Sequence, residues 1–360
     1  MSNIGLDSIL PLPFSDGPLV IAGPCSAETE QQTLETAQAL KAIGVKVFRA
    51  GVWKPRTIPG GFEGVGDRAL SWLQRVKQET GMLVATEVAT VEHVRAALDS
   101  GIDILWIGAR TTANPFAVQD IADALQGNDK IIVLVKNPVN PDLDLWIGAM
   151  LRILNAGITH VGAVHRGFSF MGEHFYRNDP QWHIPFELRR RAPQMTILCD
   201  PSHIGGKRDL VFPLASEAMA MGFDGLMIES HCNPDTALSD SLQQITPDNL
   251  KSLLGRLDFR LGTLVDDKLA LLRQQIDDCD HELLAVLARR MSVSREIGLF
   301  KKANNLRVVQ PQRYQAIINN RLGEGVRLNL NQDFVKRIFE AIHEESVRQQ
   351  LDRIDDSLSN

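Results

Sequence analysis

Short apolar runs alternate with amphipathic stretches over roughly the first 255 residues of the chain. Each run is rich in β-branched residues, ends in a polar cluster and precedes a stretch whose apolar positions have helical spacing. The runs lie at 19–23, 45–50, 82–87, 103–108, 130–136, 160–166, 195–200 and 225–230. Near-continuous apolar strands that alternate with helices are typical of a parallel sheet covered on both faces. Eight such units in about 250 residues favour a (β/α)8 TIM barrel, with a doubly wound open sheet as the alternative.

The pattern changes after about residue 255, where glycine becomes sparse and the β-branched runs stop. One long helix is predicted from Thr263 to about Lys302, because apolar residues recur at spacings of three and four. A second helix begins near Pro311 and is broken by the glycines of 323–325, and a third begins near Asn331. Such a small all-α three-helix unit buries its apolar stripe poorly, so we expect a homodimer formed through these helices. The predicted domains are therefore 1–257 and 258–360.

Composition and charge mainly exclude classes of protein. The chain has 360 residues and a formal net charge of −6, which argues against a nucleic-acid-binding protein. Its four cysteines have no regular spacing, so a reducing compartment is the simpler interpretation. No apolar run approaches the roughly 18 residues that span a bilayer, and the first residues do not resemble a signal peptide. We expect a cytoplasmic protein that binds neither membranes nor nucleic acid.

Charged or metal-ligating residues stand at or near the end of every predicted strand. In a (β/α)8 barrel the carboxyl ends of the strands meet at one mouth, where the chemistry takes place. Any one of these charges alone is ordinary at a protein surface, but several cations at one mouth repel one another strongly without bound anions. We therefore expect one or two substrates that carry phosphate and carboxylate groups. The cations in question are Arg49, Lys54, Arg56, Arg110, Lys136 and Arg166.

Four further residues offer the donor types of a metal site, namely Cys25, His203, Glu229 and Asp240. Each has an ordinary explanation by itself, since Cys25 could be a core residue and His203 a loop residue. Together the thiol, the imidazole and the two carboxylates suit a divalent transition ion, and Mn, Fe, Co and Zn all fit. Such an ion would polarise a carbonyl group and lower the pKa of a bound water. A nucleophilic Cys25 is less well supported, because no base is obviously placed beside it.

Seven motifs in the barrel segment carry a family resemblance. They are AGPCS (22–26), FRAGVWKPRT (48–57), IGAR (107–110), LVK (134–136), HRG (165–167), DPSH (200–203) and ESHCNPDTALSD (229–240). Over about residues 10–255 the chain resembles the 3-deoxy-D-arabino-heptulosonate-7-phosphate (DAHP) synthases, in their short class I form without an amino-terminal regulatory domain. The related octulosonate-phosphate synthases share the barrel but carry a KANRS-type motif where this chain has KPRT.

This resemblance implies a condensation of phosphoenolpyruvate with erythrose 4-phosphate to DAHP and phosphate. A divalent metal ion would be held by Cys25, His203, Glu229 and Asp240. Phosphoenolpyruvate would be bound by Arg49, Lys54, Arg110, Lys136 and Arg166. Erythrose 4-phosphate would lie along residues 54–57, with Arg56 and Thr57 near its phosphate group. The resemblance makes Lys54 the candidate proton donor to the new hydroxyl, while Glu87, His203 and the metal are alternatives for delivering the water.

The helical segment contains polar residues that a simple bundle does not need. Arg290 falls in the apolar stripe of the long helix, and Lys301 lies about three turns later on the same face. Arg273 points roughly a quarter-turn away, which suits a different site in an intertwined dimer. Ser346 and Gln350 share one face of the last helix. Cations buried in a bundle are costly without anionic partners, and a small dicarboxylate would supply them.

Over about residues 263–352 this segment resembles the all-helical chorismate mutases. The resemblance implies that chorismate rearranges to prephenate at Arg273, Arg290, Lys301, Arg313, Ser346 and Gln350. Lys301 and Gln350 would bond the ether oxygen, and the protein would supply orientation and electrostatics without a metal. Two positions depart from the family: a glutamate is replaced by Tyr314, and an acidic residue by Gln310, which could still bond the substrate hydroxyl.

The joining of two such units suggests regulation. We expect that prephenate or chorismate in the mutase unit changes the activity of the barrel, because the resemblance covers a barrel without its own regulatory domain. The alternative function is a DAHP synthase whose mutase-derived tail is weak or inactive and serves as a sensor or a dimerisation module.

Overall fold

The structure is a computed structural model that describes residues 5–6, 9–14, 17–54, 60–171, 175–257, 267–308 and 311–355. The chain divides into two compact units, Met1–Leu261 and Gly262–Asn360. The segment 258–266, which begins at the predicted domain boundary, lies outside the described residues.

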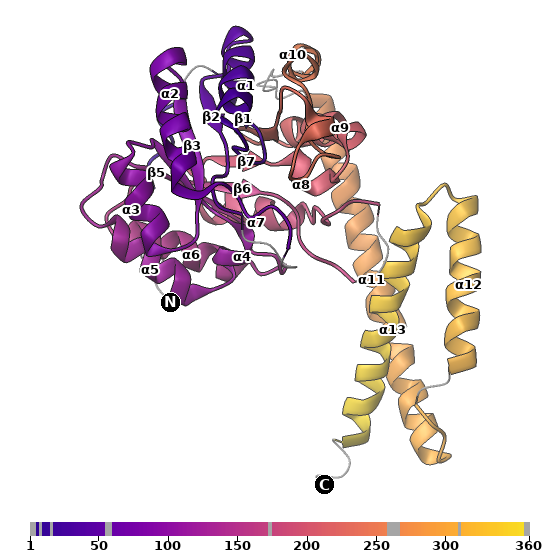
Figure 1. Ribbon diagram of the computed structural model, residues 1–360. Coiled ribbons are helices and arrows are strands. Elements are labelled where there is room, and N and C mark those ends of the chain that lie inside the picture. Colours follow the sequence, from indigo (N-terminus) through magenta and orange to yellow (C-terminus); the bar gives the residue numbers. More distant parts are fainter. Residues whose placement is uncertain are drawn as a thin grey trace. The chain divides into compact units, whose positions relative to one another are not determined.

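The first unit is a closed barrel of parallel strands that follow one another in sequence order (Figure 1). Closure rather than an open sheet is confirmed by the pairing of β1 with β8, in which Leu19 lies opposite Gly225 and Gly23 opposite Glu229. A Cβ at Gly225 would lie 2.0 Å from the Leu19 carbonyl oxygen, so glycine permits this close seam. The strands are β1 (Leu19–Gly23), β2 (Val47–Arg49), β3 (Leu83–Val88), β4 (Ile104–Ile107), β5 (Ile132–Lys136), β6 (Val161–His165), β7 (Ile197–Cys199) and β8 (Gly225–Glu229).

Helices alternate with the strands and cover the outside of the barrel (Figure 1). Six of them begin where a side-chain oxygen accepts a hydrogen bond from the backbone N–H three residues later, and these oxygens belong to Thr29, Thr90, Asn114, Asp142, Asp200 and Thr246. The helices are α1 (Glu30–Ala42), α2 (Leu70–Thr80), α3 (Val91–Asp99), α4 (Ala109–Thr112), α5 (Pro115–Leu125), α6 (Leu143–Asn155), α7 (His183–Arg191), α8 (Pro201–Gly205), α9 (Arg208–Ala220) and α10 (Pro247–Arg256). Short 3-10 turns are η2 (Gly66–Ala69) and η3 (Pro234–Thr236).

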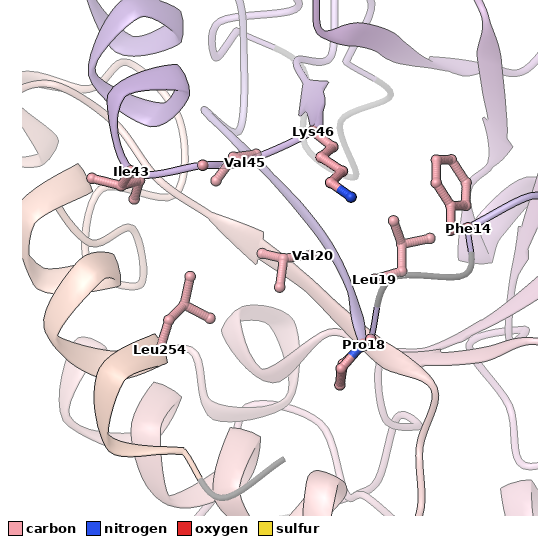
Figure 2. Close-up of a pocket in the computed structure, with 10 residues that line it drawn as sticks. Phe14, Pro18, Leu19, Val20, Ile43, Val45, Lys46 and Leu254 are labelled. Carbon is pink, nitrogen blue, oxygen red and sulfur yellow. The ribbon is translucent and has the colours of Figure 1, made fainter. Parts of the chain in front are cut away.

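The strands are buried on both faces, as their near-continuous apolar runs predict. One cluster fills the barrel interior, and it includes Ile21, Val47, Trp106 and Met227. A larger cluster lies between the strands and the helices. At the amino-terminal end of β1, a cavity of about 150 Å3 is lined by residues that include Phe14, Leu19, Val45, Lys46 and Leu254 (Figure 2). This cavity lies at the opposite end of β1 from Cys25, so it does not belong to the barrel mouth.

The second unit contains α11 (Asp267–Ala303), α12 (Pro311–Arg327) and α13 (Gln332–Asp355) (Figure 1). Helix α13 packs against both α11 and α12. The expectation that the glycines of 323–325 break the second helix is wrong, because α12 continues to Arg327. The physical reason is packing: a Cβ at Gly325 would lie 2.8 Å from Val335 Cγ2, so this glycine brings α12 and α13 together. Among the helices of the described residues, none is long and apolar enough to cross a bilayer.

Candidate functional site

Three of the four predicted metal ligands form a cluster at the barrel mouth. Cys25 follows β1, Glu229 ends β8 and Asp240 lies in the loop after β8, and their ligand atoms are all within 4.8 Å of one another. The pairing of β1 with β8 explains this proximity, because Gly23 lies opposite Glu229. His203 follows β7, and its Nε2 atom is 3.7 Å from Glu229 Oε1. The four donors therefore face one another from three neighbouring strands.

The chemistry of these donors fits a divalent cation. Burial, and then the charge of Glu229, raises the pKa of the Cys25 thiol to about 12. The protonated thiol lies 3.3 Å from Asp240 Oδ2, to which it donates. Burial tends to raise the pKa of Asp240, but His203 and nearby cations outweigh it and hold the pKa below its ordinary range. Asp240 also has a positive φ of 47°, a strained backbone that is common where function fixes a side chain.

Asp200 is a buried carboxylate that the sequence interpretation did not single out. Its Oδ2 atom lies 2.8 Å from His203 Nδ1 and 2.8 Å from Lys136 Nζ. Its Oδ1 atom accepts from the His203 backbone N–H, which makes Asp200 the N-cap of α8. Burial opposes ionisation, but His203 and Lys136 hold the pKa of Asp200 well below its ordinary value. Asp200 thus directs His203 Nε2 toward Glu229 and fixes the Lys136 ammonium group at the mouth.

Arg49 is a buried cation whose hydrogen-bonding capacity is largely unused. Only 1% of the residue is exposed, and its guanidinium carbon lies 4.8 Å from the Trp106 ring centroid. Its Nη2 atom donates to Glu229 Oε1 at 3.3 Å. Within the described part of the chain, Nε and Nη1 have no hydrogen-bond partner. Two unpaired nitrogens on a buried guanidinium are costly unless an anion binds there, so this position suits a carboxylate or a phosphate.

Lys54 lies between the metal-ligand cluster and Glu87. Its Nζ atom donates to Cys25 Sγ at 2.9 Å. Burial lowers the pKa of Lys54, but Cys25, Glu87 and Glu229 together raise it by more than burial lowers it. The net shift of the pKa is therefore upward. Lys54 therefore carries a proton at neutral pH. Glu87 is held by Trp106, whose Nε1 atom donates to Glu87 Oε2 at 3.0 Å.

Arg166 extends the cation cluster beyond β6. Its Nη1 atom donates to Asn178 Oδ1 at 2.6 Å, and its backbone N–H donates to Asn137 Oδ1 at 2.7 Å. Burial lowers the pKa of Arg166 to about 10, although Asp200 opposes this shift, and the like charges of Arg177 and Arg110 lower it further. The mouth thus contains Arg49, Lys54, Lys136 and Arg166 with Arg110 exposed at the start of α4, whereas Arg56 and Thr57 lie outside the described residues.

In the helical unit, two cations of α11 reach polar side chains of α13. Arg290 Nη1 contacts Ser346 Oγ. About three turns further along the same face, Lys301 Nζ lies 3.2 Å from Gln350 Oε1. Gly298 permits this contact between the helices, because a Cβ there would lie 3.0 Å from Gln350 Cα. The spacing of Arg290 and Lys301 along the helix therefore places both on the face that packs against α13.

The remaining mutase-like positions are only partly described by the structure. Arg313 is exposed on α12, and the neighbouring Tyr314 packs against His343 of α13 with ring centroids 4.4 Å apart and ring planes tilted by 39°. Burial, followed by the charges of Arg290 and Lys301, lowers the pKa of His343, so this imidazole also faces the cations. The side chain of Arg273 and the whole of Gln310 lie outside the described residues.

Two family models match the chain, one in each unit. Residues 15–258 match the DAHP synthetase I family, and residues 272–357 match chorismate mutase type II. The two matched segments contain both groups of polar residues described above.

Individual proteins are similar to about two thirds of this chain. Phospho-2-dehydro-3-deoxyheptonate aldolase of Thermotoga maritima is 34% identical over 235 residues, which is 65% of this chain and 67% of that protein. A 2-dehydro-3-deoxyphosphooctonate aldolase of Syntrophotalea carbinolica is 29% identical over 257 residues, covering 65% of this chain and 87% of that protein. The crystal structure of the Thermotoga maritima enzyme has a TM-score of 0.60 at 33% identity, and the match covers 67% of this chain and 68% of that chain.

The metal cluster predicts a specific effect of Cys25→Ser. A serine hydroxyl stays protonated where a thiol can become a thiolate ligand, so Mn2+ affinity should fall by more than about 10-fold. Since the pKa of Cys25 is raised to about 12, binding releases a proton, and the affinity of the unmodified protein should fall as the pH is lowered. Both effects can be measured by competition with a chelator.

Cys232→Ser is the matched control, because Cys232 lies in the barrel but outside the cluster. If Cys25→Ser bound Mn2+ as tightly as the control did, Cys25 would be removed from the ligand set.

Proposed function

Because the chain belongs to the DAHP synthetase I family and carries a chorismate mutase type II domain, we propose that each unit catalyses the reaction of its own family. The protein is a bifunctional enzyme of the shikimate pathway. Its four cysteines are free, which suits a reducing compartment, and we place both reactions in the cytoplasm.

In the barrel, carbon 3 of phosphoenolpyruvate adds to the aldehyde carbon of erythrose 4-phosphate. Water adds at carbon 2, and phosphate leaves by cleavage of its bond to that carbon, which gives DAHP. The observation that carries this proposal is the buried Arg49, whose Nε and Nη1 atoms lack a partner in the described part of the structure. With Lys136 at the end of β5 and Arg166 after β6, Arg49 forms a receptor for a small molecule that carries both a carboxylate and a phosphate.

The residues around the receptor have distinct roles in this proposal. Lys54 and Arg110 complete the binding of phosphoenolpyruvate, and the segment 54–57 binds erythrose 4-phosphate. Lys54 holds a proton at Nζ and donates it to the aldehyde oxygen as that oxygen becomes a hydroxyl. Glu87, His203 and the metal are the alternatives for orienting the attacking water. A divalent ion held by Cys25, His203, Glu229 and Asp240 would polarise the aldehyde carbonyl.

Substrate choice tests the barrel reaction. Phosphate release from phosphoenolpyruvate should require erythrose 4-phosphate and should not occur with arabinose 5-phosphate, the co-substrate expected of an octulosonate-phosphate synthase. Arg49→Lys keeps a charge but loses the planar fork, so kcat/KM for phosphoenolpyruvate should fall about 10- to 100-fold. Arg75→Lys, on the exposed surface, is the control. Turnover with arabinose 5-phosphate alone would contradict the proposed substrate.

In the helical unit, we propose that chorismate rearranges to prephenate. The observation that carries this is the pair of cations on α11, Arg290 and Lys301, which face Ser346 and Gln350 of α13. Arg290 binds a substrate carboxylate, while Lys301 and Gln350 bond the ether oxygen, where negative charge develops as its bond to carbon breaks. Because one C–O bond breaks while one C–C bond forms within the substrate, no nucleophile is required.

We further propose that the helical unit forms a homodimer and that Arg273 completes the site of the partner. Support comes from the apolar side chains that α11 leaves exposed in one chain, including Ile276, Leu283, Val293 and Ile297. Their spacing follows the length of the helix, so a second copy of the same helix would cover them.

Complementation tests the shared mutase site. Arg290→Ala and Arg273→Ala should each reduce chorismate turnover by at least about 100-fold, because each removes a charged contact. When both variants are co-expressed in one dimer, one of its two sites regains both arginines. A random mixture should therefore recover about a quarter of the activity. Chorismate absorbance gives the rate, and the absence of any recovery would contradict a site built from two chains.

Finally, we propose that prephenate in the mutase unit lowers the activity of the barrel. Any such coupling is reciprocal in binding free energy, so ligands of the barrel must weaken prephenate binding by the same factor. Saturating prephenate should lower the initial rate of DAHP formation in the unmodified protein and leave it unchanged in Arg290→Ala. Equal rates of DAHP formation with and without prephenate would contradict a regulatory function of the helical unit.

A further inference from the structure

Gln243 is a buried glutamine at the metal-ligand cluster that neither the sequence motifs nor the substrate-binding residues include. It is 1% exposed and follows Asp240 by three residues, and its backbone N–H donates to the Asp240 carbonyl oxygen at 3.2 Å. A buried amide keeps its position only when its donor and acceptor are both satisfied. Both ends of this amide are satisfied by charged groups of the mouth.

The side-chain amide of Gln243 bonds the carboxylate of Glu229 directly and is linked to the carboxylate of Asp240 through Arg177. Gln243 Nε2 donates to Glu229 Oε2 at 2.6 Å. Gln243 Oε1 accepts from Arg177 Nη1 at 2.6 Å, and the same nitrogen donates to Asp240 Oδ1 at 3.1 Å. The result is a continuous series of hydrogen bonds that runs from Glu229 through Gln243 and Arg177 to Asp240.

These bonds occupy one oxygen of each carboxylate and leave the other facing the cluster. Glu229 Oε2 is held by Gln243. Its Oε1 atom accepts from Arg49 Nη2 at 3.3 Å and lies 3.7 Å from His203 Nε2. Asp240 Oδ1 is held by Arg177, while Oδ2 faces Cys25 Sγ at 3.3 Å. The oxygens that turn inward are therefore selected by the hydrogen bonds made to the outward ones.

Arg177 reaches this position because of a local feature of the backbone. Gly206, after α8, has a φ of 68°, and a Cβ there would lie 2.5 Å from Arg177 Cβ. The charge of Arg177 also offsets the repulsion between two carboxylates held near each other. Arg177 is one of the cations that lower the pKa of Arg166, so the same guanidinium adjoins both the acidic cluster and the anion-binding residues.

We propose that Gln243 is a positioning residue of the metal centre, whose amide aligns Glu229 directly and Asp240 through Arg177 for coordination of a divalent ion. The inference rests on the metal site proposed above. Outer residues that orient metal ligands typically contribute about 10- to 100-fold to metal affinity.

The test is Gln243→Met in the full-length protein, which keeps the size of the side chain but removes both hydrogen bonds. Mn2+ affinity, measured by chelator competition, should fall about 10- to 100-fold. With Co2+ as the probe, the thiolate-to-metal absorption band of Cys25 should shift or broaden, because the other ligands are no longer aligned. Gln243→Glu keeps the oxygen that accepts from Arg177 but replaces the donor to Glu229 with a second carboxylate oxygen. The two carboxylates repel each other, so Mn2+ affinity should fall by at least as much.

Gln194→Met, at an exposed position before β7, is the matched control and should bind Mn2+ as the unmodified protein does. All five tryptophans lie in the barrel unit, so tryptophan fluorescence reports its folding when metal-free. If Gln243→Met does not fold, Arg177→Met is the second variant, because it removes the hydrogen bonds that link Gln243 to Asp240.

Unchanged Mn2+ affinity and an unchanged cobalt spectrum in folded Gln243→Met would overturn the inference and leave the metal site itself intact. A lack of any thiolate band in the unmodified protein would contradict the metal site, and with it this inference.

Discussion

The parallel pairing of β1 with β8 is the constraint on which the active site of the barrel depends. It closes the sheet between segments that lie about two hundred residues apart, and it sets Gly23 opposite Glu229. A shift of this register by one residue would turn Glu229 away from Cys25 and toward the helices. The glycine at the start of β8 allows the two backbones to approach, so the metal-ligand cluster depends on a contact at the far end of the same two strands.

Opposite charges are interleaved at the mouth rather than segregated. Arg49 is paired with Glu229 and Lys136 with Asp200, while Lys54 donates a hydrogen bond to the Cys25 sulfur. Each pair offsets part of the cost of burial, while Nε and Nη1 of Arg49 keep no hydrogen-bond partner within the described residues. These two nitrogens can bond an anion without displacing a protein partner, so this part of the site is preorganised. This arrangement suits the two phosphorylated substrates that we propose for the barrel.

Much of this architecture was predictable from the sequence, since eight apolar runs with polar ends define both the strands and the mouth. Asp200 was missed because an aspartate before a proline is adequately explained as a helix cap, and it does act as one. Gln243 carries no charge and belongs to no spacing pattern, so only the tertiary fold shows that it bonds Glu229. The predicted helix break at 323–325 was wrong for a different reason. Glycine weakens an isolated helix, but in α12 it allows α13 to pack closely.

The two units hold their cations in different ways. In the barrel, the carboxylates of Glu229 and Asp200 pair with Arg49 and Lys136 before a substrate arrives. In the helical unit, Arg290 meets a hydroxyl and Lys301 meets an amide and a backbone carbonyl oxygen, which are neutral partners. Neutral acceptors hold a cation in place without cancelling its charge, so the field of both groups remains available to a dicarboxylate and to the charge that develops on its ether oxygen. A pericyclic reaction needs this arrangement, because orientation and electrostatics are all that the protein contributes to it.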